Sequence, residues 1–552
     1  IIAPHLLTFV VDGLGPRLRH WLAPPHPTWQ SRASRNRVRA FLRSEEARTS
    51  GGVRLNVGSA SRRFGVKMLN LDLYRGENVD VQGDLLNLPL KDGSVDSVVC
   101  QGVLEHVSDP HQGVAEIHRA LKFGGRLFVE APFMQTVHAS PDDYSRWTPS
   151  GLRQLLKDFT ILECHVVAGP ASALAWQFQE TMAMLFSFGS EVGYRVGLRV
   201  FGWLAVPLSW LDVALERHPR AWHAASGYAV VAVKTRGGEE GRGSSEDIEA
   251  RLRSASWQPA GGVGRPFVRY PGVKPSPGTV WQDVPANGAV TLSVVIPTSD
   301  ASRDGYFPNL LVQIGRQDFR DFELIVVRGD PRQGRAINVG AALAQGKYLL
   351  TLDDDTSLPD PRTFSKLVAI MELYPDIGMA GGNNVIPSDA GPLVRRVMRQ
   401  IPRRSWEPVQ EIADSDLAEH PCVIMRTAEF KAVGGENELL PRGLDPYLRQ
   451  AFREAGKRVV VVPEVIYHHL PPDSVGRLLR QFFRNGQQAA FANRHYPQWV
   501  IETPSAHGPF RPRVPFRLRV VRFPVRLLRA LLTGKPVWFL CQIAYALGFA
   551  RE

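Results

Sequence analysis

Cysteine is scarce in this chain. Only four occur among 552 residues, and no two of them form a C-x-x-C pair. This number and spacing exclude a disulfide-stapled scaffold and give no zinc-binding pattern. We therefore expect a protein of the reducing cytoplasm. The four are Cys100, Cys164, Cys422 and Cys541.

Long apolar runs and internal repeats are also missing. No uncharged apolar run reaches about 18 residues, so the sequence predicts no membrane-spanning helix. The absence of a repeat excludes solenoids and propellers. The opening residues 1–4 are not followed by the basic and apolar regions of a signal peptide, so we expect a truncated start.

Acidic residues are fewer than basic ones. The chain has 54 Asp and Glu against 66 Lys and Arg, a formal net charge of +12. This excess suits an anionic partner, and composition alone does not choose among a nucleotide diphosphate, a phospholipid surface and nucleic acid. Apolar content of 44% is that of a globular protein. The length predicts about three to four domains.

An aspartate triplet is the most informative feature that is present. Asp353, Asp354 and Asp355 directly follow the apolar run 348–352. Adjacent carboxylates at a strand end repel one another unless a hard cation holds them. The triplet therefore predicts a site for Mg²⁺ or Mn²⁺ that carries a diphosphate.

The first half of the chain alternates short apolar strands with turns. A strand predicted at 53–57 ends in the small residues Gly58, Ser59 and Ala60, which let a ligand approach the backbone closely. A second strand, at 67–71, ends in Asp72, where a carboxylate can accept hydrogen bonds from ribose hydroxyls. Asp84, a strand at 94–100, Glu105 and a helix at about 110–121 follow.

Over about residues 50–235 this order resembles the class I S-adenosylmethionine-dependent methyltransferases. The resemblance implies that Gly58, Ser59 and Ala60 hold the methionine part of the cofactor. It implies ribose binding by Asp72, adenine binding by Asp84 and a cofactor contact from Glu105. Asn56 and Ala60 depart from the family, which usually has an acidic residue and a second glycine there. A dinucleotide site fits less well, since no G-x-G-x-x-G is present.

A loop at 132–148 carries the candidate residues for methyl transfer. His138 can take a proton from a sugar hydroxyl, with Asp143 or Arg146 orienting it. The plain alternative is a solvent-exposed histidine. Residues 172–215 are rich in apolar side chains, which predicts amphipathic helices lying on a membrane or on the second half, or a helical cap over the site.

The second half resembles the family 2 glycosyltransferases of the GT-A fold over about residues 290–495. The resemblance rests on a strand at 292–298, a helix, a strand at 323–327 and the Asp triplet. It implies that Asp353 and Asp355 form the D-x-D motif that meets ribose and metal. It also places Asp354, Pro297 and Asp330 at the nucleotide-sugar, with Asp330 at the base.

Two further roles follow from the same resemblance. Asp445, the second member of an acidic pair whose first member is Leu444 here, is our candidate base for an inverting displacement. Its alternative role is a favourable interaction with a helix dipole. His468 is the candidate third metal ligand, although a surface histidine pair explains it equally well. Arg477, Arg480 and Arg484 fit either a diphosphate contact or a solvated helix face.

The remaining segments complete the predicted layout. Residues 1–49 are an extension and residues 236–290 a linker, on which Trp257 and Trp281 are expected to dock on a neighbouring domain. Residues 291–500 form the glycosyltransferase domain. Residues 501–552 are a basic and apolar membrane-associating segment. Its arginines, which have no acid among them, are Arg511, Arg513, Arg517, Arg519, Arg522, Arg526 and Arg529.

We thus expect an α/β chain with two doubly wound domains and two linked activities. A nucleotide-diphosphate sugar would donate a sugar to a glycan or lipid-linked acceptor, and S-adenosylmethionine would O-methylate a sugar. The expected location is the cytoplasmic face of the inner membrane. The alternative is a first half that only binds the acceptor. A nucleic-acid methyltransferase fits less well, because no basic and aromatic stripe is present, and we expect no nucleic-acid partner.

Overall fold

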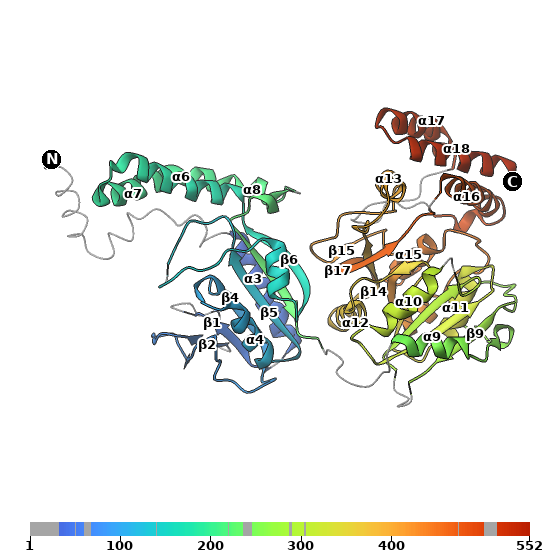
Figure 1. Ribbon diagram of the computed structural model, residues 1–552, viewed down its shortest axis with the longest axis horizontal. Coiled ribbons are helices and arrows are strands. Elements are labelled where there is room, and N and C mark those ends of the chain that lie inside the picture. Colours follow the sequence, from blue (N-terminus) through green and yellow to red (C-terminus); the bar gives the residue numbers. More distant parts are fainter. Residues whose placement is uncertain are drawn as a thin grey trace. The chain divides into compact units, whose positions relative to one another are not determined.

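A computed structural model describes most of the chain, which divides into two compact units, residues 1–235 and 236–552. Each unit is treated by itself (Figure 1). The described residues are 32–49, 51–59, 64, 68–139, 141–218, 220–235, 245–285, 290–302, 305–472, 474–501 and 516–552.

The first unit is built on a seven-stranded sheet with the order β3-β2-β1-β4-β5-β7-β6. Its strands run parallel except β7, which is antiparallel to both β5 and β6. The order reverses between β1 and β4, and ligands of such sheets bind at the carboxyl ends of the strands at that point. The strands are β1 (Arg54–Val57), β2 (Met68–Asp72), β3 (Val81–Gln82), β4 (Val95–Gln101), β5 (Leu121–Pro132), β6 (Thr160–Ala168) and β7 (Gly227–Val233).

Helix α3 (Arg32–Arg48) packs against this sheet, so residues 32–48 belong to the unit and are not a separate extension. Phe41 lies 5.5 Å from Phe128 between ring centroids. The fully buried carboxylate of Glu45 is paired with Arg126 at 3.0 Å and with Arg48 at 2.6 Å. A buried carboxylate persists only when it is paired in this way.

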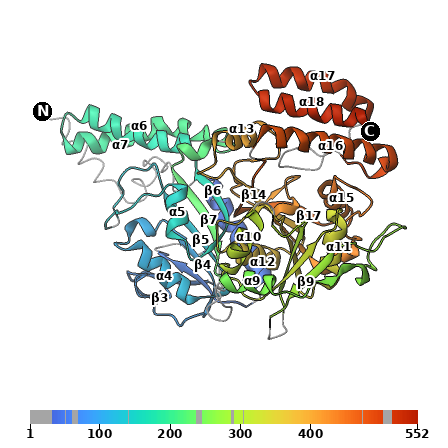
Figure 2. The ribbon, with the colours of Figure 1, turned by 45° about the vertical axis from the view of Figure 1, so that its right-hand side comes forward.

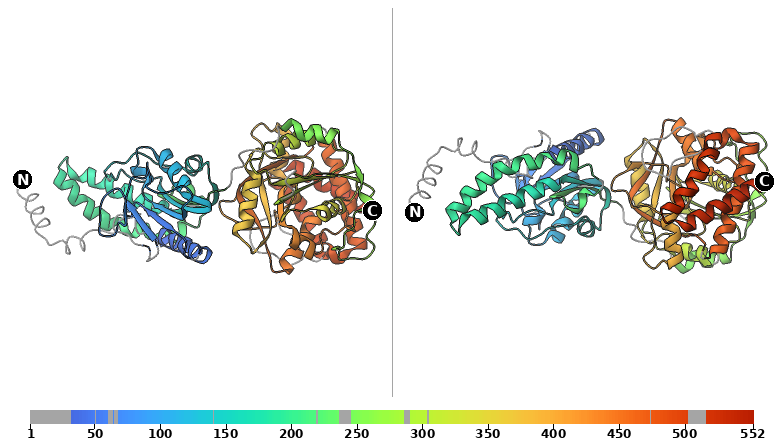
Figure 3. Two further views of the ribbon diagram at one scale, coloured as in Figure 1. Left: turned by 90° about the horizontal axis from the view of Figure 1, so that it is seen from below. Right: turned by 90° about the horizontal axis from the view of Figure 1, so that it is seen from above.

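Helices α6 (Pro170–Ser187) and α7 (Glu191–Trp210) form a hairpin that projects from the sheet (Figure 3). Small residues let the two helices approach closely, since a Cβ on Gly197 would lie 2.9 Å from the Cα of Ala183. Large apolar side chains point outward instead, and Phe188 at the tip is 91% exposed. The other exposed ones are Leu174, Met184, Leu185, Phe186, Val200, Trp203, Leu204 and Trp210.

One described helical segment, Glu191–Leu215, is long and apolar enough to cross a membrane when judged by length and composition alone. Only 17% of its most apolar 18-residue stretch is buried within the protein. The sequence predicted no such helix, because Arg195 and Arg199 interrupt the apolar run.

The second unit contains a ten-stranded sheet with the order β13-β17-β14-β16-β12-β10-β11-β9-β8, and β15 pairs with β17 beside this path. Strands β10, β11 and β12 are parallel, whereas β16 is antiparallel to β12. The strands are β8 (Gln258–Pro259), β9 (Thr279–Asp283), β10 (Leu292–Thr298), β11 (Phe322–Arg328), β12 (Tyr348–Thr351), β13 (Thr356–Ser357), β14 (Ile377–Asn384), β15 (Ala413–Asp414), β16 (Val423–Arg426) and β17 (Arg458–His469).

Helices flank this sheet, and close approach holds one of them against its centre. A Cβ on Gly340, in α11, would lie 2.4 Å from Cγ1 of Val295 in β10. The helices are α9 (Ser245–Arg253), α10 (Tyr306–Gly315), α11 (Gln333–Leu343), α12 (Thr363–Leu373), α13 (Pro392–Gln400), α14 (Thr427–Ala432), α15 (Leu444–Glu454), α16 (Val475–His495), α17 (Phe516–Leu532) and α18 (Pro536–Arg551).

The described part of the predicted linker, residues 245–285, is a folded part of this unit. Strand β9 pairs with β11, Trp281 is buried, and the guanidinium of Arg328 lies 4.1 Å from the ring centroid of Trp257. The two tryptophans therefore dock on the domain as expected. The linker prediction is wrong here, because Gly and Pro content does not reveal a short edge strand.

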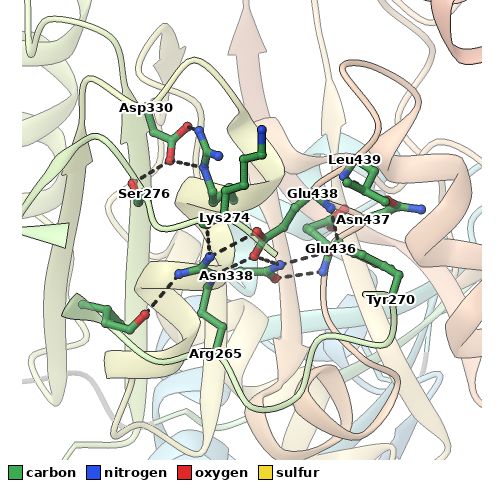
Figure 4. A network of polar contacts seen from close by, with 12 residues as sticks. Arg265, Tyr270, Lys274, Ser276, Asp330, Asn338, Glu436, Asn437, Glu438 and Leu439 are labelled. Carbon is green, nitrogen blue, oxygen red and sulfur yellow. Dashed lines mark hydrogen bonds and ion pairs between the residues drawn. The ribbon is translucent and has the colours of Figure 1, made fainter. Parts of the chain in front are cut away.

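A buried polar network anchors the same segment (Figure 4). Arg265 Nε donates to Oε1 of Glu438 at 2.6 Å, and the Tyr270 hydroxyl bonds the backbone of Glu436. Asn338 of α11 donates to both the Glu436 carbonyl, at 2.9 Å, and the Glu438 carboxylate, at 3.0 Å. The network holds residues 265–276, α11 and the loop at 436–439 in one arrangement.

The described tail residues, 516–552, also form part of the second unit. Helices α17 and α18 lie over α16 (Figure 2). Helices α16 and α18 meet at glycines, since a Cβ on Gly486 would lie 2.0 Å from the Tyr545 carbonyl oxygen and one on Gly548 would lie 1.9 Å from that of Phe483. Arg511 and Arg513, and the side chains of Arg517 and Arg519, lie outside the described residues.

Candidate functional site

The turn after β1 forms the centre of the first site. Gly58 has a φ of 66°, and a Cβ there would lie 2.3 Å from Cγ2 of Val103 in the turn after β4. Both Gly58 and Ser59 donate their backbone N–H groups to the Leu71 carbonyl, at 2.9 and 3.2 Å. Only glycine allows this approach of the β1 and β4 turns. Ala60 lies outside the described residues.

Two predicted carboxylates follow the neighbouring strands. Asp72, at the end of β2, accepts a hydrogen bond from the Tyr74 N–H at 3.0 Å. Asp84 is exposed and accepts one from the Leu86 N–H at 2.9 Å. Asn56, the departure noted in the sequence, is buried and donates to Oδ1 of Asn70 at 3.0 Å. An amide here ties β1 to β2, a role that an ionised carboxylate facing Asn70 Oδ1 would not fill.

His138 and Asp143 are brought together as the sequence predicts. Asp143 Oδ2 accepts from the His138 backbone N–H at 2.8 Å and from Arg146 Nη2 at 2.7 Å, while Arg146 Nη1 bonds the other oxygen. The hydrogen bonds from Arg146 hold the pKa of Asp143 well below its usual range. Asp143 is therefore an ionised group that orients the loop.

The His138 ring faces a buried carboxylate. Its Nε2 lies 3.8 Å from Oε1 of Glu105, whose side chain is 3% exposed. Glu105 raises the pKa of His138, and burial opposes this shift. Trp176 of α6 covers the ring at 5.4 Å between centroids. The base of the α6–α7 hairpin thus forms part of this site.

His106 is a member of this cluster to which the sequence analysis assigned no role in the site. It ends the short 3₁₀ helix Leu104–His106, and its ring lies 5.3 Å from that of His138 between centroids. The signal was present, because His106 directly follows Glu105 after a predicted strand. Its approach to a loop 32 residues later becomes visible only in the fold.

In the second unit, a cavity of about 1130 Å³ opens at the carboxyl ends of β10 and β12. The predicted residues Pro297 and Asp330 line it, together with the whole Asp triplet. Arg477, Arg480 and Arg484, one face of α16, complete the wall. Three guanidinium groups and three carboxylates that line one cavity suit a diphosphate bound through a cation.

Each aspartate of the triplet has a different environment. Asp353 Oδ1 accepts from Gln333 Nε2 at 2.8 Å, and the buried Asp354 accepts from the Thr298 hydroxyl at 2.8 Å. Asp355 Oδ1 lies 3.2 Å from His469 Nε2. Burial raises the pKa of Asp353 to about 7, with the Asp355 carboxylate adding to the shift and His469 opposing it.

His469, and not His468, lies at the triplet. Strand β17 is antiparallel to β13, and this pairing places His469 opposite Thr356, the neighbour of Asp355. Successive side chains of a strand point to opposite faces, so His468 is directed away, and its Nδ1 bonds the Val385 carbonyl at 2.6 Å. The prediction of His468 as metal ligand is therefore corrected to His469.

Asp330 lines the cavity, but other groups already bind its carboxylate. Arg335 donates to both oxygens, at 2.7 and 2.8 Å, and the Ser276 hydroxyl donates to one of them at 2.6 Å. The side chain of Asp330 is 0% exposed. Burial raises the pKa of Asp330. The hydrogen bonds from Arg335 and Ser276 lower it by more, so the net shift of this pKa is downward. In this arrangement Asp330 shapes the cavity wall, and the predicted direct contact with a base is not available to it.

A second cavity, of about 830 Å³, contains Asp445 at the start of α15. Arg404 and His469 line both cavities, so the two adjoin. Arg526 and Arg529 of α17 and Trp538 of α18 form the far wall. An acceptor in this space would therefore lie between Asp445 and the C-terminal helices.

Asp445 is linked through a buried histidine to β12, the strand that precedes the triplet. Its Oδ1 accepts from the His420 backbone N–H at 2.8 Å, while His420 Nδ1 lies 3.1 Å from the hydroxyl of Thr351 in β12. Burial opposes protonation of His420, but the Glu436 carboxylate 2.7 Å away raises its pKa to about 9. Burial alone raises the pKa of Asp445. The charges of His420 and Arg449 lower this pKa by more than burial raises it, so Asp445 is ionised.

Comparisons with known proteins match a segment of each unit to a known domain family. A family model described as methyltransferase domain matches residues 64–129, and one described as glycosyl transferase family 2 matches residues 295–427. The chain joins a methyltransferase domain to a family 2 glycosyltransferase domain. This confirms the predicted α/β architecture of two domains.

Curated and solved relatives cover only parts of the chain. A demethylmenaquinone methyltransferase of Corynebacterium kroppenstedtii is 30% identical over 134 residues, which are 24% of this chain and 58% of that protein. An uncharacterized transposon protein of Streptomyces fradiae is 50% identical over 50 residues, 9% of this chain and 14% of that protein. The chain thus spans less than two thirds of either relative.

Among solved structures, a mannosyltransferase of Pyrobaculum calidifontis in complex with GDP-Man and Mn²⁺ is 15% identical. The match covers 56% of this chain and 92% of that one, with a TM-score of 0.32. Asp72, Asp84, Glu105 and the Asp triplet lie inside the segments that the family models match. His138, Asp445 and His469 lie beyond them, so the geometry alone supports their roles.

The residues present fit both expected cofactors. Among the described residues, none forms a hydrogen bond with the buried Ser59 hydroxyl, which a polar group of S-adenosylmethionine at the β1 turn would satisfy. In the glycosyltransferase domain, Asp353, Asp355 and His469 offer ligand atoms within 4.8 Å of one another. Two carboxylates and one imidazole suit Mn²⁺, and the carboxylates alone suit Mg²⁺.

Proposed function

We propose that the chain is a bifunctional enzyme of glycan biosynthesis. Its glycosyltransferase domain transfers a sugar from a nucleotide-diphosphate sugar to a glycan or lipid-linked acceptor, and its methyltransferase domain O-methylates a sugar. The observation that carries this proposal is the meeting of two cavities at His469, one with the Asp triplet and three arginines, the other with Asp445. Tethering both activities raises the effective concentration of a shared product.

In sugar transfer, the donor diphosphate is held between the Asp triplet and Arg477, Arg480 and Arg484. A divalent cation held by Asp353, Asp355 and His469 would neutralise the departing diphosphate. Asp445 takes the proton of the acceptor hydroxyl as its oxygen attacks the anomeric carbon, and the bond to the diphosphate breaks with inversion. His420, itself held by Glu436, fixes Asp445 through its backbone N–H.

In methyl transfer, the Gly58–Ser59 turn, Asp72 and Asp84 would hold the cofactor at the edge of the sheet. The acceptor hydroxyl lies at the cluster of Glu105, His106 and His138. Asp143 and Arg146 hold the loop that carries His138. This cluster, with His138 as its catalytic member, acts on the hydroxyl proton, and Trp176 packs against the His138 ring.

The first prediction tests the cofactor site. The full chain is expected to bind S-adenosylhomocysteine with micromolar affinity, and Asp72→Ala to weaken binding by about 10-fold or more, through loss of charge-assisted hydrogen bonds to ribose. Titration calorimetry measures both. Asp92→Ala, at a carboxylate that is 80% exposed, is the matched control and should bind normally.

The same titration decides between the proposal and its alternative. If the folded chain does not bind S-adenosylhomocysteine but still transfers sugar, the first unit is an acceptor-binding module without methyl transfer. Asn56 in place of an acidic residue is the feature that motivates this alternative. Binding by the wild type and loss in the Asp72 variant would dismiss it.

We also propose that the enzyme associates with the cytoplasmic face of the inner membrane. Helix α17 exposes an apolar stripe of Val521, Val525, Leu528 and Leu532, spaced four, three and four residues apart. Arg526 and Arg529, on another face of the same helix, line the acceptor cavity. An apolar stripe beside arginines is the composition of an interfacial helix on anionic lipid.

A second prediction follows for this stripe. Val525→Asp together with Leu528→Asp should lower binding to phosphatidylglycerol and phosphatidylethanolamine vesicles by about 10-fold or more, because two apolar side chains leave the lipid. Vesicle sedimentation measures this. Val273→Asp, at an apolar residue that is 38% exposed and lies outside the tail, is the control. Unchanged binding of the double variant would contradict anchoring by α17.

A further inference from the structure

The methyltransferase domain contains a cluster of one buried carboxylate and two imidazole rings. Glu105 is buried, and among the described residues none donates a hydrogen bond to its Oε2. Its carboxylate instead faces ring nitrogens of His106 and His138, and one ligand atom from each of the three residues lies within 4.8 Å of the others. A buried carboxylate oxygen without a donor costs free energy unless a cation is shared with it.

In both imidazole rings Nδ1 faces a backbone carbonyl oxygen. His106 Nδ1 lies 2.7 Å from the Asp142 carbonyl oxygen, and His138 Nδ1 lies 2.9 Å from that of Thr136. A carbonyl oxygen only accepts, so each Nδ1 carries the hydrogen, and Nε2 of a neutral ring has none. Histidine ligands of metals are held in this way, by a backbone carbonyl on the other nitrogen.

Arg146 does not change this assignment. Its Nη2 also lies 3.3 Å from His138 Nδ1, but this nitrogen has two hydrogens. These point to the Thr136 carbonyl oxygen, at 3.0 Å, and to Asp143 Oδ2, at 2.7 Å. No hydrogen of Nη2 is left for His138, so the Thr136 carbonyl determines the tautomer of the ring.

We propose that Glu105, His106 and His138 bind a divalent transition metal, at a site distinct from the Asp triplet of the other domain. Two imidazole nitrogens and one carboxylate oxygen are a donor set for Zn²⁺, Mn²⁺, Fe²⁺ or Co²⁺, and not for Mg²⁺ or Ca²⁺. Bonds of about 2.1 Å place ligand atoms roughly 3.4 Å apart in a tetrahedral site. The 3.8 Å between His138 Nε2 and Glu105 Oε1 needs only a small contraction.

The role of this metal rests on the methyl transfer proposed above. The acceptor hydroxyl takes an open coordination position and loses its proton to water, since a bound cation lowers the pKa of a coordinated hydroxyl. The alkoxide oxygen then bonds to the methyl carbon of the cofactor as the bond from carbon to sulfur breaks. Neutral S-adenosylhomocysteine leaves. The protein acts on the hydroxyl proton through the cation that Glu105, His106 and His138 hold.

The test counts bound Co²⁺ in the chelator-treated full chain, by calorimetry and visible absorption. We expect two equivalents in the wild type and one in a background with Asp355→Asn and His469→Gln, which removes the other site. Adding Glu105→Gln or His106→Gln to this background should remove the remaining equivalent. His111→Gln, at an exposed histidine on α4 (Pro110–Ala120), should retain it.

An unchanged Co²⁺ count in the Glu105 and His106 variants would overturn the proposal and assign the cluster to an ion pair of carboxylate and imidazolium.

If these variants do not fold, pulsed electron paramagnetic resonance of Cu²⁺ in the unaltered cluster decides. Couplings to two imidazoles support the site, and coupling to one or none overturns it. Titration of metal-free protein with S-adenosylhomocysteine tests the cofactor site separately, so the two failures are distinguishable.

Discussion

Asp355→Asn is expected to reduce sugar transfer by about 1000-fold, which corresponds to roughly 4 kcal/mol of transition-state stabilisation. The carboxylate lies beside His469 at the floor of the donor cavity. Its loss removes one negative charge and one oxygen ligand from the cation, and thus the group that neutralises the departing diphosphate. Release of nucleoside diphosphate from UDP- and GDP-sugars measures the loss of activity.

The same variant should lose Mn²⁺-dependent binding of UDP or GDP in calorimetric titrations. Asp389→Asn, at an exposed carboxylate in the loop after β14, is the matched control and should bind as the wild type does. If Asp355→Asn binds the nucleotides with unchanged affinity and unchanged metal dependence, the triplet is not the metal site.

Asp445→Asn is expected to lower turnover by about 10²- to 10⁴-fold while nucleotide affinity changes by less than about twofold. Asparagine keeps the oxygen that accepts from the His420 N–H, so the loop is preserved and only the proton acceptor is lost. Asp445 lies in the second cavity, beside the donor site. Steady-state kinetics, together with nucleotide titration, separate the two effects.

Asp414→Asn is the control, because this carboxylate is 51% exposed and belongs to a surface ion pair with Arg458. Surface pairs of this kind contribute little. If nucleotide affinity falls in Asp445→Asn as much as turnover does, Asp445 organises the donor site and does not accept the acceptor proton.

Residues that directly follow strands could be located from the sequence. The Asp triplet and the Gly58–Ser59 turn both lie where the apolar pattern ends, and the structure places both at the carboxyl edge of a sheet. A strand end is a local property, visible as a change from apolar to small or acidic residues. Both domain families were recognisable for the same reason.

Other features depend on which strands pair. His468 and His469 are equivalent in the sequence, and only the register of β13 against β17 decides which one faces Asp355. A shift by one residue would exchange them, because side chains alternate along a strand. His106 and His138 likewise meet only because the loop after β5 returns to the turn after β4.

Segment boundaries were the other source of error. Composition predicted a linker at 236–290, although residues 279–283 form a strand of the main sheet, and a separate tail at 501–552, although α18 packs on α16 through glycines. Short edge strands and helices packed through small residues bury little apolar surface of their own. Their place is determined by partners that are distant in the chain.

The sequence by itself therefore determined the two domain families, the position of the Asp triplet after a strand and the small-residue turn after β1, since each is encoded within a few adjacent residues. Tertiary structure alone decided which histidine joins the triplet, that Asp445 lies in a cavity adjoining the donor site, and that Glu105, His106 and His138 converge. Those contacts join separate segments, and their geometry follows from strand register and helix packing rather than from local pattern.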